Sequence, residues 1–159
     1  MMTVCKGMKT LVLGVAAALS LLVLVGCTCV KYSYNTGTTF AGLKTYTWAG
    51  SSAGYGDRDP LLESNVQLLA DQLLGQKGFN KTREKPDLLI SIYYESDTGY
   101  SSWSDYKVQS LALNMFNPET KELIWRGTAT SRIGSINTDA GFGDLKGVVK
   151  EILSRFPPK

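Results

Sequence analysis

The sequence predicts an α+β two-layer sandwich, in which two helices cover one face of a mostly antiparallel sheet of about five strands. Two segments carry apolar residues at helical spacing, and the other ordered segments are rich in β-formers. They follow one another in the order β-β-α-β-β-β-α, without an internal repeat. Residues 27–159 have an ordinary length for a single domain with its own core.

The first two predicted strands are short. Residues 30–34 alternate in character and hold Val and Tyr, which are typical strand formers, and residues 45–48 hold Tyr and Trp. Residues 49–59 (AGSSAGYGDRD) are rich in Gly and Ser and predict a loop.

The first predicted helix begins after this loop. Asp59 is expected to be its N-cap and Pro60 its first residue. Its apolar face consists of Leu62, Val66, Leu69 and Leu73, and Gly78 is the expected stop. Asp71 and Lys77 are expected to lie on the solvated face of this helix.

Three longer strands are predicted next, over residues 88–95, 106–116 and 122–132. The last two form a hairpin around residues 117–121, where Pro118 favours a turn. Gly127 is expected to let another element pack closely on the sheet. Trp125, and Trp48 from the second strand, are expected in the core. Leu88, Ile90, Ile92 and Tyr94 are expected to share one face of their strand, and Leu111, Leu113 and Met115 are expected to alternate inward.

The second predicted helix follows a loop over residues 135–143. Asp144 is its expected N-cap, and Pro157-Pro158 ends it. Its apolar positions are Leu145, Val148, Val149, Ile152, Leu153 and Phe156.

The N-terminal segment predicts lipoprotein processing. Lys6 and Lys9 precede an apolar run over residues 11–25, which ends in Leu24-Val25-Gly26-Cys27. We therefore expect residues 1–26 to be a lipoprotein signal peptide, cleaved between Gly26 and Cys27, with Cys27 as the lipidated N-terminus of a periplasmic domain over residues 27–159. An uncleaved anchor helix is the alternative, and either Met1 or Met8 fits as the start.

Acylation of Cys27 determines where in the cell the domain is expected to lie. Acyl chains such as palmitate on Cys27 would hold the domain on a membrane almost irreversibly. Thr28 lacks the acidic side chain that favours inner-membrane retention, so the expected site is the outer membrane, facing the periplasm, or the plasma membrane of a host without an outer one. Cys29 is a competing acceptor with a poor recognition sequence, or a bystander thiol.

Composition excludes several chemistries. The chain has no histidine, which excludes Ser-His-Asp catalysis and His-based zinc sites. After processing, Cys29 is the one thiol left, so no intramolecular disulfide or Cys-based metal cluster can form. Two of the 17 basic residues precede Cys27, so the remainder nearly balances the 14 acidic ones, which argues against nucleic-acid binding. We expect no metal, no cofactor and no enzymatic activity.

One loop has the composition of a binding surface. Tyr100, Trp103 and Tyr106 lie among serines near residues 96–105, and aromatic side chains supply contact area at a small entropy cost. A solvated loop with partial packing is the simpler alternative. Asp97 and Asp105 are the carboxylates of a second hypothesis, a hydrolase acting on envelope polymers by acid–base chemistry.

A set of short motifs resembles one bacterial family. The set comprises Tyr46-Thr47-Trp48 after Phe40 and Lys44, Lys77-Gly78-Phe79, Pro86-Asp87-Leu88-Leu89, Leu123-Ile124-Trp125-Arg126-Gly127, and Ile152-Leu153 with Phe156-Pro157-Pro158, in this order. It is similar to the lipoprotein domain-of-unknown-function family 4136 (DUF4136), over about residues 30–159. The resemblance implies an envelope lipoprotein with an α+β domain and no catalytic residues. We expect a non-enzymatic module that binds an envelope protein, glycan or lipid, or has a structural role.

Overall fold

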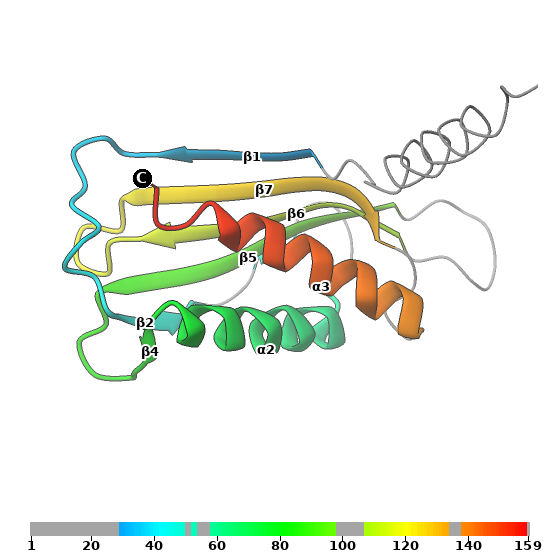
Figure 1. Cartoon of the computed structure of the whole chain (residues 1–159), viewed down its shortest axis with the longest axis horizontal. Helices are drawn as coiled ribbons and strands as arrows, with labels where there is room; N and C mark the ends of the chain where they lie inside the picture. The colour runs from blue at the N-terminus through cyan, green and yellow to red at the C-terminus, as the bar shows by residue number, and fades with distance from the viewer. Residues whose placement is uncertain (1–28, 50–51, 54–57, 98–106, 134–137, 159) are drawn as a thin grey trace, which may run out of the picture.

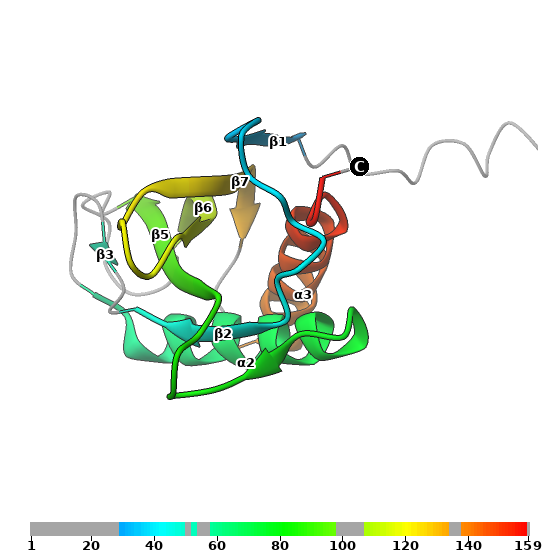
Figure 2. The same ribbon diagram turned by 90° about the vertical axis from the view of Figure 1, so that its left-hand side faces the viewer.

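The computed structural model describes residues 29–49, 52–53, 58–97, 107–133 and 138–158, which form two layers. One layer is a seven-stranded sheet, and the other holds helices α2 (Pro60–Gln76) and α3 (Asp139–Ser154). Both helices lie on one side of the sheet and pack against each other (Figures 1 and 2). The predicted α+β two-layer sandwich is confirmed.

The strand order of the sheet is β1-β7-β6-β5-β2-β4, and β3 also pairs with β5. The strands are β1 (Cys29–Tyr34), β2 (Thr45–Trp48), β3 (Ser52–Ala53), β4 (Asn80–Lys81), β5 (Leu88–Asp97), β6 (Lys107–Phe116) and β7 (Leu123–Ile133). The predicted strands are present with small shifts in their ends. Two-residue strands β3 and β4 are additional, and β3 lies inside residues 49–59, which we predicted to be a loop.

The sheet is mixed rather than mostly antiparallel, which corrects the prediction. The long ladders β1–β7, β7–β6 and β6–β5 are antiparallel, whereas β2, β3 and β4 make parallel pairs. The reason is the position of α2 in the chain. A helix between two neighbouring strands returns the chain to the same end of the sheet, so β2 and β5 run in the same direction.

The core lies between the sheet and the helices. The four residues predicted to share one face of β5 are all buried, as are the residues predicted to point inward on β6 and Trp125 on β7. A Cβ on Gly127 would collide with the Trp125 ring and would lie 2.8 Å from Cγ2 of Ile152 on α3. The expectation that Gly127 permits close packing is therefore confirmed. Leu123 lies two residues before Trp125 on β7 but is exposed, because the ladder changes register between Met115 and Phe116.

Helix α2 begins and ends where the sequence predicts. The Asp59 carboxylate accepts hydrogen bonds from the backbone N–H groups of Leu61 and Leu62, and Pro60 is the first helical residue. At the other end, Gly78 has φ +84°, which is a conformation that glycine adopts without strain. The chain then turns directly into β4.

Helix α3 begins earlier than predicted, at Asp139, and its N-cap is Thr138 rather than Asp144. The Thr138 hydroxyl accepts a hydrogen bond of 3.1 Å from the backbone N–H of Gly141. Part of the predicted loop over residues 135–143 is thus helical, and Gly141 is buried within the first turn, where packing outweighs the low helix propensity of glycine.

Candidate functional site

The predicted site residues at the N-terminus and in the long loop lie outside the described residues: Gly26, Cys27, Tyr100, Trp103 and Tyr106. The same holds for Asp105 and for the side chain of Asp97, the carboxylates of the hydrolase hypothesis. Within the described part of the chain, no three acidic, Cys or His side chains gather as metal ligands, and no helix has the length and hydropathy to span a membrane.

The structure instead brings polar groups together around Asp71 on α2. The Asp71 carboxylate accepts hydrogen bonds from the Tyr46 hydroxyl at 2.7 Å and from Nε1 of Trp48 at 2.8 Å. Its second oxygen lies 3.0 Å from Nζ of Lys81 on β4. The prediction that Asp71 simply lies on a solvated face is wrong, because this carboxylate joins α2 to two strands.

This arrangement fixes the protonation state of Tyr46. Burial, followed by the hydrogen bond to Asp71 and its negative charge, raises the pKa of the Tyr46 hydroxyl far above its ordinary value. Tyr46 therefore remains a proton donor throughout the physiological range. Both oxygens of Asp71 are engaged, so this carboxylate positions the Trp48 ring and the Lys81 ammonium.

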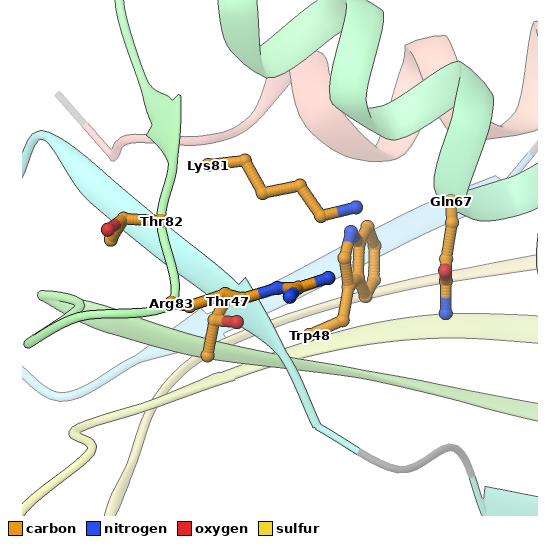
Figure 3. A pocket seen from close by; sticks show the side chains of 6 residues that line it. All are labelled: Thr47, Trp48, Gln67, Lys81, Thr82 and Arg83. Atoms are coloured by element: carbon orange, nitrogen blue, oxygen red, sulfur yellow. The ribbon is translucent and has the colours of Figure 1, made fainter.

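A hollow of about 400 Å³ lies beside this cluster. Its lining residues come from β2, α2 and the segment that includes β4, and they are Thr47, Trp48, Gln67, Lys81, Thr82 and Arg83. Figure 3 shows the Lys81 and Arg83 side chains extending toward the Trp48 indole, with Gln67 on the other side of the ring. We refer to this hollow as the edge pocket, since β4 is the last strand of the sheet.

The edge pocket contains a cationic side chain, Arg83, that has no ion-pair partner among the described residues. Lys81 is paired with Asp71, whereas Arg83 is exposed and forms no hydrogen bond or ion pair within the described residues. None of the lining residues is acidic. A guanidinium, an amide and an indole face together suit an anionic ligand with a flat apolar surface.

A second carboxylate holds the strand that carries the edge pocket. One oxygen of Asp87 accepts hydrogen bonds from the backbone N–H groups of Lys44 and Thr45 at 2.9 and 2.8 Å, and from the Thr45 hydroxyl at 2.8 Å. These bonds lower the pKa of Asp87, with the Lys44 bond contributing most. The start of β5 is thereby fixed to the start of β2.

Other polar clusters are paired internally. Glu63 is buried and accepts a hydrogen bond of 2.6 Å from Nη2 of Arg58, whose pKa is raised by that contact. On the sheet face opposite the helices, Tyr93 and Ser110 both donate to Glu95, and the bond to Glu95 raises the pKa of Tyr93. A hollow of about 580 Å³ lies there, but its carboxylate already has partners.

Sequence reasoning missed the edge pocket because β4 is only two residues long and because its contacts span distant parts of the chain. One signal was available. Tyr46 and Trp48 are large side chains on one strand face, each with a polar hydrogen that needs a partner when buried. An acidic residue flanking the apolar face of the following helix, such as Asp71, can supply that partner.

Several solved structures are similar to this chain at low sequence identity. A PelC dodecamer from Paraburkholderia phytofirmans is 12% identical with a TM-score of 0.56, over 80% of this chain and 96% of that chain. A PDZ domain protein from Parabacteroides distasonis is 15% identical with a TM-score of 0.60, over 91% of this chain but 40% of that chain. A lipoprotein from Neisseria meningitidis, GNA1162, is 14% identical with a TM-score of 0.48, over 73% of this chain and 99% of that chain.

The first two likenesses, with TM-scores above 0.5, support the two-layer fold and nothing more specific. A comparison with curated proteins gives no match. A family model described as "Domain of unknown function (DUF4136)" matches residues 30–158, which is nearly all of the described domain. The chain therefore belongs to the DUF4136 family.

Proposed function

We propose that this protein is a lipid-anchored lipoprotein of the bacterial cell envelope, whose domain is a non-enzymatic binding module. The anchor is Cys27, released as the N-terminus by removal of residues 1–26. In a host with an outer membrane the domain faces the periplasm from that membrane. The apolar run ending in Leu24-Val25-Gly26-Cys27 supports the anchor, and membership of DUF4136 is consistent with it.

The observation that carries the binding role is the state of Asp71. It is the carboxylate that contacts the edge pocket residues, and both of its oxygens accept hydrogen bonds. A carboxylate held in this way is poorly suited to take a proton from water, whereas Arg83 and Gln67 are available to contact a ligand. At the edge pocket, recognition is therefore better supported than acid–base catalysis by Asp71.

The anchor is tested by metabolic labelling with an alkyne analogue of palmitate. The full chain should incorporate the label and fractionate with membranes, and Cys27→Ser should abolish both. Cys29→Ser is the matched control and should label like the unmodified chain. Label retained in Cys27→Ser would contradict the proposal, and label lost only in Cys29→Ser would move the anchor by two residues.

The absence of catalysis is tested on envelope polymers. Purified protein incubated with isolated cell-wall glycan should release no new reducing ends above a no-protein control. Release that disappears in an Asp97→Asn, Asp105→Asn double variant would replace the binding role by the hydrolase alternative.

A further inference from the structure

The strongest unassigned feature is the exposed guanidinium of Arg83. It extends toward the Trp48 ring (Figure 3), and it forms no ion pair in the described part of the chain. Lys81, the other cation of the edge pocket, is neutralised by Asp71 at 3.0 Å. The local excess of positive charge therefore resides on Arg83, and a guanidinium binds a carboxylate through two parallel hydrogen bonds.

The Trp48 ring next to it is a rigid platform. Its Nε1 is held by Asp71 at 2.8 Å, and its ring meets the Tyr46 ring edge-on, with centroids 6.4 Å apart and an interplanar angle of 88°. These contacts fix the plane of the indole before any ligand binds. A fixed aromatic face favours a flat ligand surface with aliphatic hydrogens, and the ordering cost of binding is small.

Polar groups surround this platform. The Gln67 amide offers two donors and an acceptor, and the Thr47 hydroxyl can donate or accept. Neither has a hydrogen-bond partner among the described side chains. The pocket thus combines an anion receptor, an apolar face and neutral hydrogen-bonding groups, which correspond to the carboxylate, the ring face and the hydroxyls of an acidic sugar.

We propose that the edge pocket binds a carboxylated saccharide, with its carboxylate on Arg83 and its ring face on Trp48. This proposal deepens the binding role proposed above and rests on it. The sheet order supports a ligand outside the bilayer, because β4 lies at the opposite edge of the sheet from β1, five strands along in the strand order. The proposed anchor at Cys27 precedes β1 by two residues, so the pocket lies at the sheet edge opposite the strand that follows the anchor.

The test is titration of the full chain in detergent with three probes: trigalacturonate, its fully methyl-esterified form, and inorganic phosphate at matched ionic strength. Trigalacturonate should bind, and the ester, which lacks the charge, should bind at least about tenfold more weakly, equivalent to about 1.4 kcal/mol. Phosphate should compete weakly because it cannot use the indole face.

Variants assign the binding to the pocket. Arg83→Gln should weaken trigalacturonate binding at least about tenfold, while Arg155→Gln, at an exposed arginine that caps α3 and does not line the pocket, should leave it unchanged. Trp48→Leu should also weaken it, and Trp48→Phe should retain most of it because a flat ring remains. Circular dichroism checks that each variant is folded.

Equal binding of acid and ester, or equal displacement by phosphate, would overturn the saccharide assignment. So would the absence of binding tighter than about 1 mM to the unmodified chain. The unlabelled Cys27→Ser chain should bind trigalacturonate like the unmodified chain. Failure of the anchor is therefore seen in labelling, and failure of the ligand assignment is seen in titration.

Discussion

At one edge of the sheet, β1 forms a six-residue antiparallel ladder with β7, whereas at the other edge β4 pairs with β2 over only two residues. The β1 edge carries the stacked rings of Tyr32 and Tyr34, which remain 48% and 41% exposed. The β2–β4 edge compensates for its short ladder with carboxylates that accept hydrogen bonds from neighbouring elements. Backbone pairing thus holds the edge near the anchor, and ionised side chains hold the edge that forms the pocket.

The largest loss of stability is expected from a substitution where the two edges of the sheet meet. Phe156 is fully buried and contacts Phe40, which follows β1, and Phe79, which precedes β4. Phe156→Ala should lower the free energy of unfolding by about 3–5 kcal/mol in urea titrations. Phe142→Ala, at the half-buried start of α3, is the matched control and should cost clearly less. Similar costs for both would show that the edges are not joined through Phe156.

The second-largest loss of stability is expected when the charge of Asp87, which holds the pocket edge, is removed. Asp87→Asn should cost about 1.5–3 kcal/mol at pH 7, since the carboxylate accepts three hydrogen bonds. The folded pKa of Asp87 is lowered, so this stability is present above the unfolded pKa of about 3.9 and is lost as the pH falls through the folded value. Urea titrations at pH 7 and near pH 2 should therefore show a difference that shrinks in acid. Asp144→Asn, at an exposed position, is the control and should change the free energy of unfolding little at either pH. If the destabilisation by Asp87→Asn persists near pH 2, the charge of Asp87 is not what stabilises this edge.

A smaller loss of stability is expected when Asp71 is substituted. Asp71→Asn should destabilise the domain by about 1–2 kcal/mol, because the pair with Lys81 is partly exposed and only its hydrogen bonds to Tyr46 and Trp48 are shielded. The specific signature is faster solvent exchange of the Trp48 indole N–H in NMR spectra, with the resonance assigned through Trp48→Phe. Gln72→Ala, an exposed neighbour on α2, should leave that exchange unchanged. Unaltered exchange in Asp71→Asn would mean that Asp71 does not position the indole.

The smallest effect is expected on the β1 edge. Tyr32→Thr keeps a strand-forming residue at an exposed position, so the free energy of unfolding should change by about 0.5 kcal/mol or less. Thermal melting of this variant beside the unmodified chain provides the measurement. A cost above about 1 kcal/mol would show that side chains, and not only the β1–β7 ladder, stabilise this edge.

The elements that sequence analysis located best are those with strong local signals. Asp59, Pro60 and Gly78 mark the ends of α2, and the alternation on β5 and β6 selects the buried face. The start of α3 was missed because Gly141 disfavours a helix locally, while its burial against the core decides the outcome. The parallel pairing and β4 were missed because they depend on where α2 returns the chain. The edge pocket depends on all of these and on contacts from Asp71 to two residues of β2 that lie 23 and 25 residues away in sequence.

The position of the two edges has a mechanical consequence. A domain tethered at β1 and pulled through Arg83, which follows β4, would bear part of the tension across the strands, along the direction of the inter-strand hydrogen bonds. The two-residue β2–β4 ladder would be the shortest ladder in that path. The Asp71–Lys81 pair spans this ladder from α2, so it would transfer part of the load to the helical layer.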